Sequence, residues 1–303
     1  MTTAWTRLIR FTARETGGKK VHIGEPVDPQ LDVGLAVLNG TPVKAYEISG
    51  TSALDYRATV TSRVLTVLTL LSPVDAKEVG VARFLGLNYS DHAKENNLAE
   101  PKYPVLFYKP PTALIDPFDP IVVSRAVQPP EEHLSDYECE LVVVLGRLAR
   151  DVKESEALDY VLGYTGGNDV SFRKHQTAVP QFGFSKGFDA SAPWGPCLVS
   201  AKAIRDPQKL PIKTTLNGQV LQDGNTKDMI FSVATAIAFL SQGTTLLPGS
   251  ILWTGTPAGC GFARKPPVVL KHGDDVRVWV GGGIGTLVNP VEEEGKGAVR
   301  AKL

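Results

Sequence analysis

Short apolar runs separated by glycine and proline fill most of the chain beyond Val79. The run at residues 141–145 is short and β-branched, so it predicts a strand, as does the run at 251–253 after Pro248-Gly249. Asn217-Gly218 stands between apolar residues and is a strong hairpin signal. Residues 271–280 predict another strand, with its turn at Gly273-Asp274. The pattern indicates a β-rich α+β chain.

Helical spacing is rarer. Residues 231–241 carry an apolar stripe, and Gly243 follows them as a stop signal, which predicts a helix. Residues 89–97 have helical spacing too. Residues 153–162 have helical character and could carry the chain from the strand at 141–145 back to a second strand. The chain therefore has few helices among many strands.

The first 75 residues form a separate small module by their pattern. Apolar and polar residues alternate on both sides of Gly40-Thr41-Pro42, which is a turn signal. The predicted strands here span residues 5–11, 20–23, 35–39 and 43–48. We therefore predict a small N-terminal β-rich lobe at residues 1–75 and a catalytic domain at residues 76–303.

Composition excludes two classes of partner. The 303 residues carry a formal net charge of zero, with no concentration of basic residues, so no nucleic acid is expected. The longest apolar stretch, residues 64–71, contains Thr66 and Thr69 and is too short to span a bilayer. We therefore predict small-molecule chemistry away from a membrane.

Cysteine usage favours a reducing compartment. The chain has only three cysteines, and their spacing matches no metal-binding pattern. They are Cys139, Cys197 and Cys260. Cytoplasm is the expected location. Arg7, Arg10 and Arg14 stand near the N-terminus without an acidic residue, so a mitochondrial location stays open.

Two carboxylates precede the strand at 141–145. Glu138 and Glu140 are two residues apart, so in extended chain they project from one face while Cys139 turns away. Anions held this close repel one another unless a positive group lies between them, and a hard divalent cation is the simplest such group. Two solvated acids at a strand end remain the alternative.

A third carboxylate lies about thirty residues on. Asp169 follows Gly166 and Gly167, which allow a close backbone approach. Glu138, Glu140 and Asp169 together suit an octahedral oxygen site for Mg²⁺ or Mn²⁺, with positions left for water and substrate. Glu138→Ala is expected to abolish activity with little loss of stability, because it relieves crowding among anions.

At this point the sequence resembles the fumarylacetoacetate hydrolase (FAH) family, in particular its acylpyruvase and oxaloacetate decarboxylase group. The resemblance covers roughly residues 80–292, in order and at family-like spacing. The segments that carry it are residues 84–92, 105–110, 137–141, 168–173, 186–189, 217–218, 229–232, 254–259 and 284–290.

The resemblance implies an FAH-type mixed β-sandwich roll and a homodimer formed through the catalytic domain. It implies Mg²⁺ or Mn²⁺ as cofactor, with Ca²⁺ as a substitute in crystals. The expected enzyme acts on small 2-oxo or 2,4-dioxo acids through a metal-bound enolate. It would hydrolyse a C–C bond, as in acylpyruvate or fumarylpyruvate, or decarboxylate oxaloacetate.

Other outcomes stay open. The same scaffold would serve an oxaloacetate keto–enol tautomerase or an isomerase of aromatic degradation. A non-catalytic relative that binds metal and ligand is the alternative of another class. The full set of expected ligands and the pair of His92 and Glu95 argue against it.

His92 and Glu95 are the expected acid–base pair. They are three residues apart on the predicted helix at 89–97, so their side chains are neighbours. A carboxylate beside an imidazole orients it and raises its basicity, which suits proton abstraction from water. An ordinary surface pair is the alternative. The family resemblance implies a mobile lid here that becomes ordered with ligand.

Five further residues are expected at the site, Lys186 among them by its position in the family pattern. Lys186 is expected to reach the metal ligands and the developing oxyanion, and it would stay charged beside three carboxylates. Gly255 and Thr256 are expected at the substrate carboxylate, and Lys109 near the pocket. Arg173 is expected to bind substrate or, preferably, to brace Asp169.

The chain departs from its relatives at Lys174, where many of them carry aspartate. This departure could alter the surroundings of Asp169.

Overall fold

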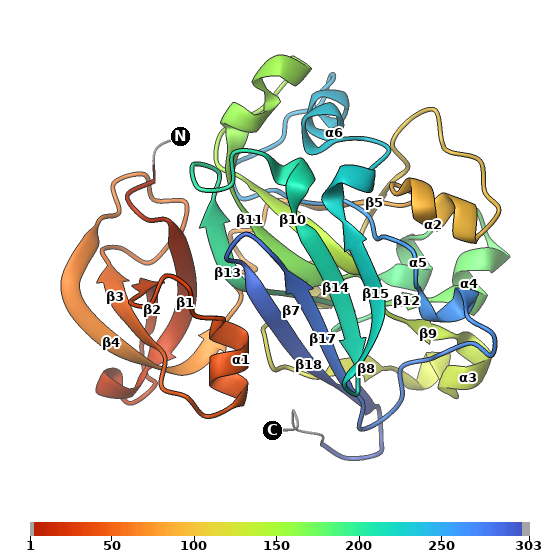
Figure 1. The fold of residues 1–303 in the computed structure, drawn as a ribbon, viewed down its shortest axis with the longest axis horizontal. Coiled ribbons are helices and arrows are strands. Elements are labelled where there is room, and N and C mark those ends of the chain that lie inside the picture. Colours follow the sequence, from red (N-terminus) through yellow and green to blue (C-terminus); the bar gives the residue numbers. More distant parts are fainter. Residues whose placement is uncertain (1–2, 299–303) are drawn as a thin grey trace.

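The structure is a computed structural model and describes residues 3–298. The N-terminal strands form a small ring in which each strand pairs with two others. Figure 1 shows this lobe at the left, beside the larger body of the molecule. Its strands are β1 (Arg7–Ala13), β2 (Val21–Pro26), β3 (Lys44–Ile48) and β4 (Val60–Leu71).

Strand β1 connects the lobe to the rest of the molecule. Its start, Arg7 and Leu8, pairs with Val199 and Leu198 of strand β13, whereas its later residues pair with β2 and β4. One strand therefore belongs to both parts. The expected boundary at residue 75 follows the end of β4 and stays a prediction.

Residues 35–38 are helical and Asn39 caps the helix, so the strand predicted at residues 35–39 is wrong. Helix α1 (Val33–Leu38) begins after Asp32, whose carboxylate accepts the backbone N–H of Leu35 at 3.1 Å. This N-cap satisfies an otherwise free donor at the helix start. Asp32 is a helix-start signal that the apparent alternation of the following residues concealed.

The large body is organised around the continuation of the same sheet, which contains eleven strands in all. Beyond β1 it runs β13–β11–β10–β16–β5–β6, with β7 beside β13. These strands are β5 (Ala82–Leu85), β6 (Leu106–Tyr108), β7 (Leu114–Ile115), β10 (Cys139–Leu145), β11 (Val161–Asn168), β13 (Ala192–Ser200) and β16 (Ile251–Trp253).

A second sheet of five strands covers one face of the large sheet (Figure 1). The main core between them contains Val143, Tyr164, Ile212 and Val278. Its strands are β8 (Ile121–Val123), β14 (Pro211–Leu216), β15 (Gln219–Asn225), β17 (Asp275–Val280) and β18 (Gly285–Glu293). The Asn217-Gly218 hairpin is confirmed, because both residues have positive φ, 50° and 83°, between paired strands β14 and β15.

Strand β10 is buried on both faces, as its continuous apolar sequence requires. Leu141 and Val143 face the core shared with the second sheet, and Val142 and Val144 pack in a core on the opposite face. The predicted β-rich architecture is therefore confirmed. Glu140 within β10 and Glu138 immediately before it are consequently fixed to a completely buried strand.

The remaining elements are short. Residues 154–160 form a 3₁₀ helix rather than an α-helix, and they do return the chain from β10 to β11. A two-stranded sheet consists of β9 (Ser135–Asp136) and β12 (Ser171–Phe172). The helices beyond α1 are α2 (Ser90–Glu95), α3 (Pro130–His133), α4 (Arg173–Ala178), α5 (Gly183–Lys186) and α6 (Val233–Leu240).

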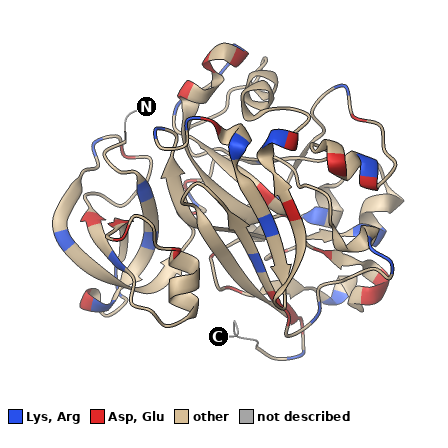
Figure 2. Cartoon of the chain, viewed as in Figure 1, with Lys and Arg blue, Asp and Glu red and all other residues tan. Residues whose placement is uncertain are grey.

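Charged residues of both signs are interspersed over the chain (Figure 2). Among residues 3–298, no helix is long and apolar enough to cross a bilayer.

Candidate active site and metal centre

Antiparallel pairing brings the three expected carboxylates together. Cys139 of β10 lies opposite Asn168 of β11, so the next pair along this register is Glu138 and Asp169. The backbone N–H of Asp169 donates to the Glu138 carbonyl oxygen at 2.9 Å. One oxygen each of Glu138, Glu140 and Asp169 lies within 4.8 Å of the others, and all three residues are buried.

Gly167, opposite Glu140, leaves room for the ring of Trp253. A Cβ at this position would lie 2.2 Å from the ring of Trp253. The glycine is therefore required by the packing of this aromatic ring against β11.

Three cations surround the carboxylates. The ammonium of Lys186 lies 2.7 Å from Glu138 Oε2 and 2.6 Å from Asp169 Oδ2. The ammonium of Lys109 lies 2.7 Å from Asp169 Oδ1, and Arg173 Nη1 lies 2.6 Å from Glu138 Oε1. All three cations are almost completely buried, so they are committed to these ion pairs.

These neighbours shift the pKa values of Glu138 and Glu140 in opposite directions. Burial alone would raise the pKa of Glu138, but Arg173 and Lys186 outweigh burial and hold that pKa far below its usual range. Burial raises the pKa of Glu140 well above its usual value, and the charges of Asp169 and Glu138 raise it further. For Lys186, the two acids outweigh burial and raise the pKa of the ammonium.

The site fits a divalent cation. Glu140 Oε2 accepts the backbone N–H of Gly255 at 2.8 Å, whereas its Oε1 is buried without a hydrogen-bond partner among the described residues. With Asp136, four buried carboxyl groups face the three cations, so ionisation of all four would leave one negative charge unbalanced. A hard cation would supply that charge and occupy the unpartnered oxygen.

Two expected contacts differ in their partners. Arg173 braces Glu138 and Asp136, with Nε 2.9 Å from Asp136 Oδ2, rather than the expected Asp169. Lys109 instead holds Asp169 and donates to the carbonyl oxygens of Val170 and Ser191. Its position behind Asp169, outside the lining of the cavity, does not favour the expected contact with substrate.

Lys174 is exposed and does not approach Asp169. Its ammonium lies 3.7 Å from Glu132 on the surface. The departure from the family pattern therefore leaves the carboxylate cluster as described.

Helix α2 brings His92 to the edge of the carboxylates. His92 Nδ1 lies 3.4 Å from Glu95 Oε2, and the Glu95 carboxylate accepts the backbone N–H of Gly259 at 3.0 and 3.1 Å. Asp91 accepts the backbone N–H of Ala258 at 3.2 Å. Side-chain bonds to the loop at residues 258–259 thus hold this short helix over the site.

The loop containing Gly255 and Thr256 lies beside β10. Gly255 has φ 85°, and a Cβ there would lie 2.8 Å from that of Asn88, so only glycine fits. The hydroxyl of Thr256 accepts Gln222 Nε2 at 2.7 Å. The roles expected for Gly255 and Thr256 at a substrate carboxylate stay predictions.

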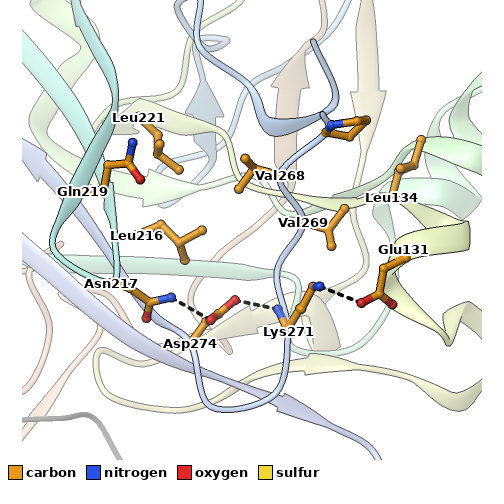
Figure 3. Close-up of a pocket in the computed structure, with 11 residues that line it drawn as sticks. Glu131, Leu134, Leu216, Asn217, Gln219, Leu221, Val268, Val269, Lys271 and Asp274 are labelled. Carbon is orange, nitrogen blue, oxygen red and sulfur yellow. Dashed lines mark hydrogen bonds and ion pairs between the residues drawn. The ribbon is translucent and has the colours of Figure 1, made fainter. Parts of the chain in front are cut away.

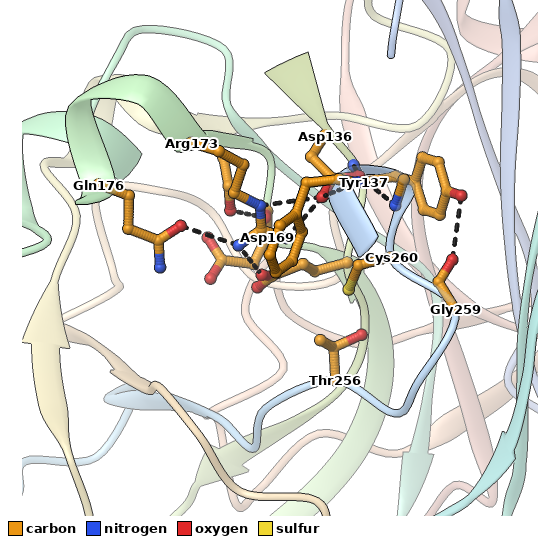
Figure 4. A network of polar contacts seen from close by, with 12 residues as sticks. Asp136, Tyr137, Asp169, Arg173, Gln176, Thr256, Gly259 and Cys260 are labelled. Atoms are coloured by element: carbon orange, nitrogen blue, oxygen red, sulfur yellow. Dashed lines mark hydrogen bonds and ion pairs between the residues drawn. The ribbon is translucent and has the colours of Figure 1, made fainter. Parts of the chain in front are cut away.

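Sequence reasoning missed two buried supports. Gln222 accepts the backbone N–H of Cys139 at 3.0 Å and donates to Thr256, so it links the strand of the acids to the neighbouring loop. Asp136 pairs with Arg173 and accepts the backbone N–H of Gly261 at 2.7 Å. Figure 4 shows Asp136, Arg173 and their neighbours. Asp136 continues the alternation of Glu138 and Glu140, which could have revealed it.

A cavity of about 390 Å³ opens onto this cluster. Its lining includes four charged or titratable residues, Glu138, Lys186, Arg173 and His92. Apolar residues share this lining, and they are Leu87, Leu98, Val105, Phe182 and Phe262. The cavity therefore suits a ligand that combines an anionic group with an apolar one.

A second hollow lies elsewhere on the surface (Figure 3). It has a volume of about 510 Å³, and Leu216, Leu221 and Val268 contribute to its lining. Lys271 and Glu131 form an ion pair across its rim at 2.7 Å. None of the residues expected at the site lines this hollow.

Comparison with known proteins places these features in a family. The description "Fumarylacetoacetate (FAA) hydrolase C-terminal" matches residues 83–292. Caffeoylpyruvate hydrolase of Neonothopanus nambi is 53% identical over 295 residues, covering 97% of this chain and 96% of the relative. Oxaloacetate tautomerase Fahd2a, mitochondrial, of Rattus norvegicus is 40% identical over 225 residues, covering 74% of this chain and 69% of the relative.

A solved structure agrees over nearly the whole chain. It is that of 2-hydroxyhepta-2,4-diene-1,7-dioate isomerase from Mycobacterium marinum, with a TM-score of 0.77 and 33% identity. The match covers 96% of this chain and 100% of that one.

Proposed function

We propose that this chain, which belongs to the fumarylacetoacetate hydrolase family, is a divalent-metal-dependent hydrolase that cleaves a C–C bond of an acylpyruvate. Its place in the family makes it an enzyme of the oxo-acid group. The observation that carries the finer proposal is the lining of the cavity, which combines charged and apolar residues. The pyruvoyl part of the substrate would contact the charged residues, and the acyl group would contact the apolar ones.

Glu138, Glu140 and Asp169 would hold Mg²⁺ or Mn²⁺, because three carboxylate oxygens suit these hard ions. When bound, the ion would act as a Lewis acid on the oxo acid. Lys109 and Arg173 would keep the ligands in place from behind, through Asp169 and Glu138 respectively. Lys186 would present positive charge to the oxygen that becomes negative during the reaction.

His92 and Glu95 would activate the attacking water. Glu95 orients the imidazole through Nδ1, so the other ring nitrogen can take a proton from water. The resulting hydroxide adds to the distal carbonyl carbon, and the C–C bond to the methylene carbon breaks. The bonding electrons leave with the pyruvate enolate, which regains the proton at carbon. One acylpyruvate and one water thus give a carboxylic acid and pyruvate.

Oxaloacetate chemistry is the second candidate, as tautomerisation or decarboxylation. The relative from Rattus norvegicus favours it. Oxaloacetate is small and doubly anionic, so it would use the charged residues of the lining and leave the apolar ones without a matching group. For this reason we rank it second, together with the isomerisation suggested by the structure from Mycobacterium marinum.

A panel of substrates tests the proposal. The metal-free protein is assayed with acetylpyruvate, an aromatic acylpyruvate and oxaloacetate, with and without Mg²⁺ or Mn²⁺, and pyruvate is measured directly. We expect metal-dependent pyruvate release from the acylpyruvates, with higher kcat/KM for the aromatic one. Turnover of oxaloacetate alone would contradict the hydrolase and support the second candidate.

We further propose a cytosolic homodimer. Arg7 and Arg10 belong to strand β1, where Arg7 is buried and Arg10 pairs with Asp75. These arginines therefore have structural partners, and they give no argument for a mitochondrial location. Dimerisation through residues 76–303 is supported by the family resemblance, and a monomeric mass by light scattering at micromolar concentration would contradict it.

A further inference from the structure

A second group of potential metal ligands adjoins the carboxylate cluster and has a different chemistry. Single donor atoms of His92, Cys260 and Glu138 lie within 4.8 Å of one another, and all three residues are buried. Cys260 Sγ lies 3.9 Å from His92 Nδ1. The set therefore combines sulfur, nitrogen and oxygen, whereas the neighbouring triad consists of oxygen alone.

The spacing is close to what zinc requires. Tetrahedral zinc has bonds of about 2.3 Å to sulfur and 2.0–2.1 Å to nitrogen, which separates those two atoms by roughly 3.6 Å. The observed 3.9 Å needs a shift of only a few tenths of an ångström. A rotation of the Cys260 side chain within its loop would supply it.

The nitrogen and sulfur donors, His92 Nδ1 and Cys260 Sγ, have only long polar contacts. His92 Nδ1 has polar neighbours in Glu95 and Asn96, at 3.4 and 3.3 Å. Cys260 Sγ has Gln222 Nε2 at 3.7 Å. These are long contacts for hydrogen bonds, so a metal ion would break little at His92 and Cys260. Glu138 differs, because its oxygens pair with Arg173 and Lys186 at 2.6 and 2.7 Å, and it would bind the ion through a remaining lone pair of one of these oxygens.

We propose that His92, Cys260 and Glu138 form a second metal site, which takes a borderline-soft divalent ion of the zinc or cobalt class and inhibits the enzyme. Thiolate and imidazole select such ions over Mg²⁺ and Mn²⁺, which prefer oxygen. The fourth position would be left to water.

Binding requires one proton to leave the thiol. Burial, with the nearby charge of Asp136, raises the pKa of Cys260 well above its usual value. Free Cys260 is therefore a neutral thiol and a poor nucleophile. A coordinating thiol loses its proton to solvent as the bond between sulfur and metal forms, and no oxidant or reductant is involved. The ion would also remove His92 from its contact with Glu95, which explains the inhibition.

Cobalt provides a direct readout that needs no activity. Co²⁺ is added to metal-free protein, with excess Mg²⁺ present, and the near-ultraviolet thiolate-to-cobalt charge-transfer band is recorded. We expect the band in the wild type and in Cys197→Ala, whose cysteine is equally buried but contacts Arg7 instead. Cys260→Ala should lack it, and added Zn²⁺ should abolish it in the wild type.

Inhibition provides the second readout and rests on the proposed function. The Zn²⁺ concentration that halves Mg²⁺-supported turnover should rise by about tenfold or more in Cys260→Ala, because loss of a mere ligand-orienting group already costs 10–100-fold in affinity. Cys260→Ser, of nearly the same size, replaces it if the alanine variant does not fold.

The outcomes separate the two proposals. Absence of the cobalt band in the wild type, or its persistence in Cys260→Ala and Cys260→Ser, overturns the second site whatever the enzyme's substrate. Equal Zn²⁺ inhibition of the wild type and the cysteine variants shows that Zn²⁺ acts at the carboxylates, and this also overturns it. A normal cobalt band without turnover of any oxo acid contradicts the proposed function alone.

Discussion

The three carboxylates and helix α2 are held in place in different ways. Glu138, Glu140 and Asp169 are fixed by the backbone register of β10 and β11, which are buried strands in the centre of the large sheet. His92 and Glu95 belong to a helix of six residues whose N-cap, Tyr89, makes no side-chain capping bond. That helix is attached to the neighbouring loop by two carboxylates.

The difference suggests that the carboxylates and helix α2 have different mechanical requirements. Metal ligands must keep one geometry, and a strand pair within a packed core provides it. A base that covers a buried site must let substrate enter, and a short helix held by a few side-chain bonds can open at small cost. We therefore expect changes at the three carboxylates to affect every reaction, and changes at α2 to affect only some.

The largest effect is expected from removing a carboxylate. Glu138→Ala and Glu140→Gln should each lower activity by more than about 10²-fold, because losses of groups that only orient a ligand cost 10–100-fold. Their stabilities should differ. Glu138→Ala leaves Arg173 and Lys186 buried without this partner and should cost about 3–5 kcal/mol in unfolding free energy.

Glu140→Gln should cost far less, since the surroundings already disfavour its charge. This corrects the expectation that Glu138→Ala leaves stability almost unchanged, because the structure reveals the two buried cations. Urea unfolding of both variants, alongside turnover with Mg²⁺, measures the contrast. Equal stabilities would mean that the two glutamates share the same electrostatic environment.

The next effect concerns His92. His92→Ala should reduce acylpyruvate hydrolysis by about 10²–10⁴-fold, the usual contribution of general acid–base catalysis. Decarboxylation of oxaloacetate needs no attacking water and should fall much less. Both rates are measured on the same preparation of the variant, so a loss of folded protein would lower both rates equally. Equal losses would show that His92 closes the site for every reaction and is no selective base.

Sequence patterns predicted the carboxylates on the strands better than the side-chain pairings that surround them. The alternation of Glu138 and Glu140 before an apolar run was sufficient to indicate a shared face, because strand geometry is local. The pairings of Arg173 with Asp136 and of Gln222 with Thr256 depend on three-dimensional proximity across the fold. No local spacing encodes them. The same reason explains why Lys109, adjacent to a recognisable motif, proved to support Asp169 from behind.

Helix α1 shows a similar limit of sequence patterns in the prediction of secondary structure. Its residues alternate like a strand over a short window, and five residues are too few to distinguish the two periods. The capping bond from Asp32 to Leu35 decides in favour of helix.

A smaller effect is expected in local opening. Backbone amides of residues 93–97 should exchange with solvent at least about tenfold faster than those of residues 141–145, because the former are held by a short helix and the latter by the central sheet. A non-hydrolysable oxo-acid analogue with Mg²⁺ should slow exchange in α2 and leave β10 unchanged. Hydrogen–deuterium exchange with mass spectrometry measures both. Equal protection of the two segments without ligand would remove the basis for calling α2 a lid.

The smallest effect concerns Leu98, one of the apolar residues that line the cavity. Leu98 lines the cavity and is 55% exposed without ligand, so Leu98→Ala removes a contact with the acyl group and leaves little internal void. Partial burial of a leucine side chain against substrate contributes about 1 kcal/mol, so KM for an aromatic acylpyruvate should rise roughly fivefold. KM for acetylpyruvate should stay constant, because its methyl group does not extend that far.

Leu148→Ala is the matched control, since Leu148 is 58% exposed and does not line the cavity. An equal rise for both substrates would show that Leu98 acts through α2, to which its backbone N–H is bonded at Ala93, and would contradict the assignment of this wall to the acyl group.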